Sequence, residues 1–325
     1  MYDISVVVLT YNPDWNKLQN TLTSILMQTE VSYEIIVCDD GSKVDLSGTI
    51  KEFFSAKNFS DFKIVKAETN RGTILNIKAG CDVAQSPYVK LISPGDYLHD
   101  ETVLKRYCDA FISHGADGVF GEARYYAYDN GYELVNLRAP KFNFYKKSPK
   151  PKKIIRYLLV YRDYILGASM AYRREVLADY LNVLHDSGIV YTEDLATTML
   201  AVDGKSFYCI DGYSVWYECD TGISAPNSKM LRLVQNDQKI FYTECLPGYK
   251  SSGKIRKTAK MYKRFEKCKS AFSEKLINFF YFPSNFFFRL RLKFKIAFAR
   301  KKIKGDLSCL YRIIGQGETD ADKEV

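Results

Sequence analysis

The stretch that decides the fold is Ile4–Asn12, ISVVVLTYN, in which a run of apolar and β-branched residues ends in three polar ones. Three similar runs follow it along the chain: Glu34–Cys38 (EIIVC), Phe62–Val65 (FKIV) and Tyr88–Ile92 (YVKLI). Short apolar runs of this kind, bounded by turn residues, are typical of buried strands. We therefore expect four strands in the N-terminal third of the chain.

Between these runs the apolar residues have helical spacing, as at Leu18, Leu22 and Ile25. An alternation of strands and helices predicts a parallel sheet that is covered by helices on both faces. In such sheets, ligands bind outside the carboxyl ends of the strands, near the point where the strand order reverses. The four strand ends read TYN, DDGS, ETNRG and SPGD. Polar side chains thus gather where a ligand would bind.

The rest of the chain has a different pattern. A helix is expected at Glu101–His114, followed by a strand-like stretch in which Asp129-Asn130-Gly131 is a hairpin turn signal. Lys141–Arg156 carries seven positive charges and no acid, which predicts an exposed basic loop. A second compact half begins near Asp163. The expected organisation is a main domain at 1–225, divided into 1–115 and 116–225, then a helical basic and aromatic region at 226–314 and a flexible tail at 315–325.

The composition excludes several classes of protein. With 46% hydrophobic and 26% charged residues, the chain of 325 residues is neither disordered nor fibrous. The eight cysteines are scattered without a CxxC pair, which predicts reduced thiols rather than disulfides or a zinc site. No apolar run reaches the length of a transmembrane helix. The N-terminus lacks the basic start and cleavage site of a signal peptide, so we expect a cytoplasmic protein.

The net charge of +9 is concentrated near the C-terminus. Lys254–Gly305 contains 17 Lys/Arg and two acids, and within it Lys275–Gly305 combines nine basic residues with aromatic runs such as LINFFYFP. Basic side chains can meet anionic head groups while aromatic rings enter the bilayer interface, which predicts peripheral attachment to the inner face of the cell membrane. A merely solvated basic face or a partner-binding segment is the alternative. Nucleic-acid binding is not expected, because the remaining chain is net acidic and carries no motif of that class.

Four motifs in series resemble the family 2 glycosyltransferases of bacterial surface-polysaccharide type: SVVVLTYN, QTEVSYEIIVCDDGS, TNRGTILNIKAG and YVKLISPGDYL. The segments GASMAYRREVL, TEDLATTML and YECDTGIS resemble that family's acceptor-side region, so the resemblance covers Tyr2–Ser224. It implies an α/β protein of the GT-A fold, Rossmann-like, with a mostly parallel central sheet. It also implies an inverting hexosyltransferase that uses a UDP- or dTDP-sugar donor and a saccharide acceptor carried on a polyprenyl lipid.

The same resemblance implies which residues bind the donor. Tyr11 would lie near the base, Asp40 would contact the uracil or thymine ring, and Arg71 would lie near the phosphates. From the residues alone, Asp39 and Asp40 are also compatible with an Asx-type turn before a helix, and Asp39 is expected to support that turn. The implied donor-binding residues are Thr10, Tyr11, Asn12, Asp39, Asp40, Asn70, Arg71, Gly72, Ser93 and Asp96.

The stretch Ser93-Pro94-Gly95-Asp96 departs from the family pattern. Aligned on its flanks, the family's Asp-x-Asp becomes Ser93 and Gly95, and only Asp96 remains as an acid. One carboxylate can suffice for Mn²⁺ or Mg²⁺, because the donor's phosphates and water complete the coordination shell. Asp96 is therefore the expected metal ligand. The alternative is a strand-to-helix turn in which Asp96 caps nearby backbone groups.

Thr192-Glu193-Asp194 precedes the apolar run LATTML. The resemblance implies that Asp194 is the general base, with Glu193 beside it as the alternative base. A base must take the proton of the acceptor hydroxyl as that oxygen attacks, and a neighbouring acid raises the pKa of a carboxyl toward neutrality. The alternative makes Thr192 a helix N-cap followed by two acids at the positive end of the helix dipole.

The acids missing at Ser93 and Gly95 leave a catalytically degenerate scaffold protein as the rival function.

Overall fold

The computed structural model describes residues 1–128, 131–140, 149–219, 228–268, 270–288, 302–303 and 305–315. The contacts given below are those among these residues. Four predicted segments lie outside them in whole or part: the tip of the 129–131 turn, the basic residues 141–148, the tail residues 289–301, and 316–325.

The N-terminal half forms a parallel sheet, as the sequence predicts. Its strands are β1 (Ile4–Thr10), β2 (Tyr33–Asp39), β3 (Phe62–Lys66) and β4 (Tyr88–Ile92). The helices between them are α1 (Trp15–Leu26), α2 (Ser47–Ala56) and α3 (Thr73–Val83). β1 pairs in parallel with both β2 and β4, and β2 pairs with β3, so the order is β3-β2-β1-β4. The strand order therefore reverses between β1 and β4.

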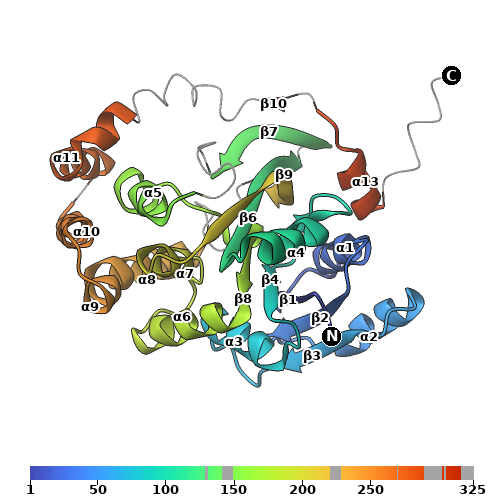
Figure 1. Ribbon diagram of the computed structural model, residues 1–325. Helices are drawn as coiled ribbons and strands as arrows, with labels where there is room; N and C mark the ends of the chain where they lie inside the picture. The colour runs from blue at the N-terminus through green and yellow to red at the C-terminus, as the bar shows by residue number, and fades with distance from the viewer. Residues whose placement is uncertain are drawn as a thin grey trace.

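The sheet continues beyond β4 with antiparallel and mixed pairing (Figure 1). β8 (Met170–Arg173) runs antiparallel between β4 and β6 (Gly118–Tyr128). β6 pairs with β7 (Tyr132–Ala139) and with β9 (Phe207–Glu218), and β9 holds the short β5 (Tyr97–Leu98). The expected α/β class is confirmed.

The remaining helices pack on the faces of the sheet and beyond one side of it (Figure 1). They are α4 (Val103–His114), α5 (Pro151–Ile155), α6 (Arg174–Asp186), α7 (Leu195–Val202), α8 (Leu231–Ile240), α9 (Leu246–Tyr249), α10 (Gly253–Phe265), α11 (Ala271–Tyr281) and α13 (Ser308–Ile314). The predicted basic loop is wrong over its C-terminal part, where α5 begins at Pro151 and buries Ile154. Proline suits the first position of a helix, because its missing N–H would have no partner there.

The core lies on both faces of the sheet, because successive side chains of a strand point to opposite faces. On β1, Val7 packs in a cluster with residues of α3 and α6, whereas Val6 and Val8 pack in a second cluster with α1, α2 and α4. The eight cysteines are free thiols and five of them are buried, as expected.

The C-terminal region, residues 226–314, contacts residues 1–225 at two separate places (Figure 1). On one side, Met261 of α10 and Phe282 after α11 pack against Val160. On the other, β10 (Lys302–Ile303) pairs with β7, and Leu310 of α13 packs in a cluster with Trp216. Among the described residues, no helix has the length and apolar character needed to cross a bilayer.

Candidate active site

The polar strand ends line one cleft of about 470 Å³ at the carboxyl ends of β1, β2 and β4. This is the place that the strand reversal between β1 and β4 predicts. Asn12, Asp39 and Arg71 lie next to the cleft but do not line it. The predicted site residues in its wall are Thr10, Tyr11, Asp40, Asn70, Gly72, Ser93, Asp96, Glu193 and Asp194.

Asp40 organises the loop that leads into α3. Its carboxylate is buried and accepts hydrogen bonds from the backbone N–H groups of Arg71 at 3.0 Å and Gly72 at 2.7 Å. Its own backbone N–H donates to the carbonyl of Thr10 at 2.9 Å. The strand ends of β1 and β2 and the loop before α3 are thus joined at one carboxylate.

Asp39 supports its turn, as expected. Its carboxylate accepts hydrogen bonds from the backbone N–H and the hydroxyl of Ser42. Asn12 adopts a positive φ of 45°, and its side-chain oxygen accepts from the N–H of Lys43 at 2.9 Å. These contacts hold the TYN and DDGS loops against each other at the edge of the cleft.

Gly72 is required by a close approach between two loops. Its φ is +88°, and a Cβ atom there would lie 2.1 Å from Cγ1 of Val190. The carbonyl of Val190 also accepts the N–H of Ile74 at 3.0 Å. The loop that leads into α3 therefore packs directly on the segment that precedes Glu193 and Asp194.

Glu193 and Asp194 stand at the start of α7, but the hydroxyl of Thr192 does not cap that helix. Asp194 occupies the N-cap position without a side-chain capping bond, and Thr192 instead donates to Asp237 at 3.3 Å. The alternative of Thr192 as N-cap is wrong, because its hydroxyl is engaged by α8. Oδ1 of Asp194 is buried and has no hydrogen-bond partner among the described residues.

The environment of this acidic pair favours the protonated forms. Burial raises the pKa of Glu193, and the charge of Asp194 raises it further. Burial also raises the pKa of Asp194. Glu193 lies against Gly167, where a Cβ atom would come within 2.6 Å of Oε1, so only glycine leaves room for this carboxylate.

Asp96 lies in a tight turn at the end of β4. Its N–H donates to the carbonyl of Ser93 at 3.0 Å, and the hydroxyl of Thr21 donates to its carbonyl at 2.9 Å. The turn that precedes α4 is held by Asp100, which accepts from the N–H of Thr102 at 2.9 Å, and α4 itself has no side-chain capping bond. Burial raises the pKa of Asp96 to about 7, and the charge of Lys90 opposes this shift.

Three charged residues near the Asp96 turn were not predicted. Lys90 is fully buried on β4, and its Nζ donates to the carbonyls of Leu91 at 2.6 Å and of Ala168. Burial lowers the pKa of Lys90 to about 7. Lys17 forms an ion pair with Glu218 at 2.5 Å across the cleft wall, from α1 to the end of β9. Lys90 could have been found from the sequence, because it is a lone lysine within the apolar run YVKLI. The ion pair could not, because Lys17 and Glu218 are far apart in sequence.

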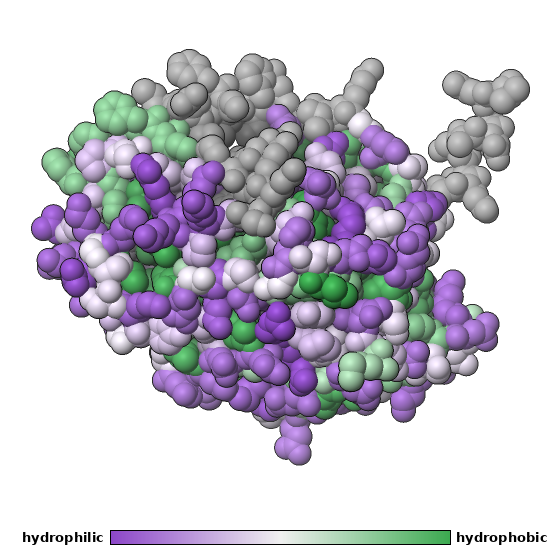
Figure 2. All heavy atoms as spheres, viewed as in Figure 1, coloured by the Kyte–Doolittle hydropathy of each residue, from purple (hydrophilic) through white to green (hydrophobic). Residues whose placement is uncertain are grey.

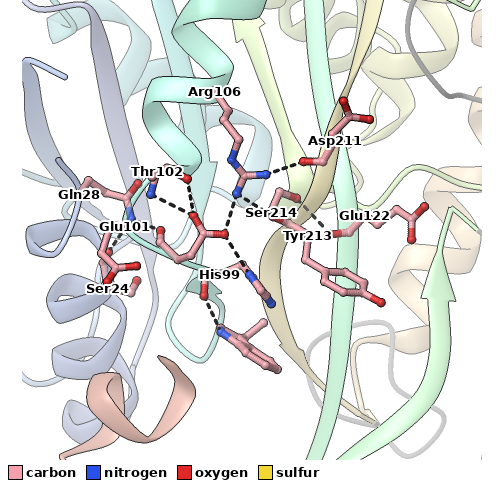
Figure 3. Close-up of polar contacts among 12 residues, drawn as sticks. Ser24, Gln28, His99, Glu101, Thr102, Arg106, Glu122, Asp211, Tyr213 and Ser214 are labelled. Atoms are coloured by element: carbon pink, nitrogen blue, oxygen red, sulfur yellow. Dashed lines mark hydrogen bonds and ion pairs between the residues drawn. The ribbon is translucent and has the colours of Figure 1, made fainter. Parts of the chain in front are cut away.

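Arg106 fixes the strand that ends in the cleft wall. From α4 it donates to the carbonyls of Asp211 at 2.6 Å and Tyr213 at 3.0 Å on β9 (Figure 3). It also pairs with Asp100 at 2.8 Å, in the turn that follows β5. These bonds join α4 to the first half of β9, and the pairing of Tyr97 with Trp216 joins its second half, which ends at Glu218, to the strand that follows the Asp96 turn.

A divalent ion would meet few protein ligands in this cleft. No group of three or more His, Cys, Asp or Glu within the described ranges is arranged to hold a metal. Asp96 offers one carboxylate in the cleft wall. This donor set fits an ion that arrives with the phosphate oxygens of a ligand and keeps several waters.

Curated relatives with sequence similarity are bacterial enzymes. Glycosyltransferase GlyA of Streptococcus pneumoniae is 29% identical over 145 residues, which are 44% of this chain and 20% of the relative. Glycosyltransferase GlyG of the same organism is 32% identical over 126 residues, 39% of this chain and 40% of the relative. The poly-beta-1,6-N-acetyl-D-glucosamine synthase of Staphylococcus epidermidis is 33% identical over 98 residues, 30% and 23% respectively. The chain thus matches two fifths or less of each of these relatives.

Solved structures with the same fold include two of S. aureus TarS, residues 1–349. The complex with UDP gives a TM-score of 0.51 at 18% identity, covering 80% of this chain and 70% of that chain. The structure without UDP in its title gives 0.50 at 19% identity, covering 80% and 79%. These matches and the sheet described above confirm the expected GT-A fold. The family model "Glycosyl transferase family 2" matches residues 5–181, more than half of the sequence, and the chain therefore belongs to glycosyl transferase family 2.

Proposed function

We propose that the protein is an inverting glycosyltransferase that moves one sugar from a UDP- or dTDP-sugar to a saccharide acceptor in cell-surface polysaccharide synthesis. One observation carries the proposal: Glu193 and Asp194 line the same cleft as the strand ends at Thr10 and Asp40, and Asp194 is not used as a helix cap. The curated relatives named as glycosyltransferases, and as a synthase of a polysaccharide, support it.

In the proposed reaction Asp194 is the general base. It takes the proton of the acceptor hydroxyl while that oxygen attacks the anomeric carbon from the side opposite the diphosphate. The bond between the sugar and the diphosphate breaks, and the nucleoside diphosphate leaves with the bonding electrons. The raised pKa of Asp194 suits a base that works near neutral pH. In this proposal Glu193 is the neighbouring acid that helps to keep the pKa of Asp194 raised.

The donor occupies the opposite wall of the cleft in this proposal. Tyr11 and Asp40 receive the base, and Arg71 reaches the phosphates from the loop that Asp40 holds. Asp96 would hold Mn²⁺ or Mg²⁺, with the donor's phosphate oxygens and water supplying the other ligands. When bound, such an ion offsets the negative charge that develops on the departing diphosphate.

The acceptor is proposed to be carried on a polyprenyl lipid at the inner face of the cell membrane, where the protein would attach peripherally from the cytoplasm. Helix α11 supports this, because Phe272, Leu276 and Phe280 recur every four residues and are 73%, 47% and 69% exposed. Figure 2 shows apolar residues gathered over the corner where Figure 1 has α11. The neighbouring α10 and the turn that follows it expose basic side chains that suit anionic head groups: Lys254, Arg256, Lys257, Lys260, Lys263, Arg264 and Lys267.

A catalytically inactive scaffold is the second candidate, favoured by Ser93 and Gly95 in place of acids. The two functions are separated by incubating the protein with a panel of nucleotide sugars and Mn²⁺, with and without acceptor. We expect release of one nucleoside diphosphate, with UDP tested first because the TarS structure contains it. A protein that binds nucleotide sugars but neither hydrolyses nor transfers any of them would be the scaffold.

A further inference from the structure

We propose that Asp237 of α8 is a positioning residue that holds the segment Val190–Thr192, and through it Asp194, in the geometry that the reaction needs. This inference rests on the proposed function. Oδ2 of Asp237 accepts hydrogen bonds from the N–H of Val190 at 3.2 Å, the N–H of Tyr191 at 2.6 Å and the hydroxyl of Thr192 at 3.3 Å. The next two residues of the chain are Glu193 and Asp194.

The place of Asp237 on its helix explains why its carboxylate meets this segment. It is 3% exposed and lies three residues after the buried Val234 of α8 and four residues before the buried Phe241, which directly follows that helix. Val234 and Gln238 line the cleft on either side of it. A buried carboxylate in this setting is held in place by the hydrogen bonds it accepts, and such bonds are stronger than those between neutral groups.

The segment held by Asp237 also contacts the donor side of the cleft. Val190 packs on Gly72 and accepts the N–H of Ile74, while the N–H of Gly72 is held by Asp40. Two carboxylates on different elements thus hold the two loops that meet at Val190. Loss of Asp237 would remove only some of the bonds that hold the segment Val190–Thr192, because the hydrogen bond from the N–H of Ile74 to the carbonyl of Val190 would remain.

Asp237 touches no reacting atom in this proposal, so its effect must pass through the position of Asp194. A displacement of about 1 Å at a catalytic group can lower a rate about 100-fold. We therefore expect Asp237→Ala to lower kcat about 100-fold while the KM for the donor changes by less than about threefold. Asp237→Asn keeps an oxygen that can accept the same three hydrogen bonds, so it should retain at least about a tenth of the wild-type kcat.

Asp203 offers a matched control in the same part of the fold. It follows α7 at the end remote from Asp194, and it accepts hydrogen bonds from Tyr180 at 3.0 Å, Tyr249 at 2.5 Å and Lys250 at 2.7 Å. Asp203→Ala removes a comparable set of bonds without touching the segment Val190–Thr192. It should lower the melting temperature but leave kcat within about threefold of wild type.

The experiment measures kcat and KM of the full chain, together with deuterium exchange of the peptide that contains Val190–Asp194. Faster exchange and a lower kcat in Asp237→Ala, with neither in Asp203→Ala, support the proposal. Unchanged exchange in Asp237→Ala overturns it, as does an equal loss of kcat in both alanine variants. If wild type transfers and hydrolyses nothing, the proposed function fails, whereas the exchange comparison still tests whether Asp237 holds the segment.

Discussion

The carboxylate of Asp40 lies 2.7 Å from the backbone nitrogen of Gly72, so an acid at the end of β2 fixes the entrance to α3. The residue expected to contact the base therefore also determines the shape of its pocket. This double role sets the first prediction.

Asp40→Ala should raise the dissociation constant for UDP at least tenfold, because the loop at Arg71 and Gly72 loses both of its hydrogen bonds to the carboxylate. A hydrogen bond to a charged group contributes about 1.5–3 kcal/mol, and about 1.4 kcal/mol corresponds to a factor of ten in binding. Isothermal titration calorimetry would measure the change. Asp45→Ala is the control, since Asp45 is an exposed partner of Lys66; an equal effect in both variants would contradict the prediction.

Asp194→Asn should lower the rate of transfer at least 100-fold and leave the affinity for UDP unchanged, because the variant keeps the shape of the site but cannot take a proton. Steady-state kinetics and calorimetry on the same preparation would measure both quantities. Asp186→Asn, at an exposed carboxylate at the end of α6, is the control. Wild-type transfer by Asp194→Asn would remove this residue from the mechanism.

The raised pKa of Glu193 predicts a dependence of stability on pH. Its pKa in the folded state lies above the unfolded value of about 4.3, so raising the pH above about 4.3 ionises the unfolded state first and favours unfolding. Glu193→Gln should therefore have the higher melting temperature at pH 8, by about 1–2 °C for each kcal/mol gained in a chain of this length. The difference should vanish near pH 4, where the carboxyl is protonated in both states. A difference that does not depend on pH would refute this account.

Removal of divalent ions should abolish transfer, with activity restored by Mn²⁺ in excess over the chelator. Asp96→Asn should raise the Mn²⁺ concentration needed for half-maximal rate, because it replaces a carboxylate in the cleft wall by a weaker ligand. Titration of the rate with Mn²⁺ would measure this. Full activity in excess EDTA would show that cations of the protein offset the charge of the diphosphate instead.

Phe272→Ser combined with Phe280→Ser should weaken binding to vesicles that contain anionic lipid, because both rings are largely exposed on α11. Sedimentation with vesicles of about 30% phosphatidylserine would measure the bound fraction. Ile112→Ser is the matched control, since Ile112 is 70% exposed on α4. Substitutions are preferable to truncation, which would also remove β10 from the sheet. Equal binding by the double variant and wild type would exclude α11 as the contact.

Local patterns in the sequence were sufficient for the four N-terminal strands and for the position of the cleft. The runs that begin at Ile4 and Tyr88 carry their own boundaries, and parallel strands must end at the same edge of the sheet. The resemblance to family 2 then supplied roles for Asp40 and Asp194, and the structure brings both to the cleft. These roles stay predictions until the variants above are measured.

Features that depend on distant contacts could not be predicted in this way. Asp237 and Thr192 are separated by 45 positions, and nothing in the sequence near either residue indicates that they meet. Threonine is favoured as a helix N-cap, so local propensity predicted that the hydroxyl of Thr192 would bond to the backbone of the following helix, which is wrong. The ion pair between Lys17 and Glu218 spans 201 positions and was missed for the same reason.

The C-terminal region is anchored at two places on the part of the fold that holds the cleft, at Phe282 and again at β10. A protein attached to a bilayer through a single flexible linker can turn its active site in any direction. Here the aromatic face of α11 belongs to a helix that is packed on the same body as the cleft. If α11 meets the membrane, the cleft is presented at a fixed angle and height above the lipid surface, and the reach of the acceptor from that surface limits which sugars it can deliver.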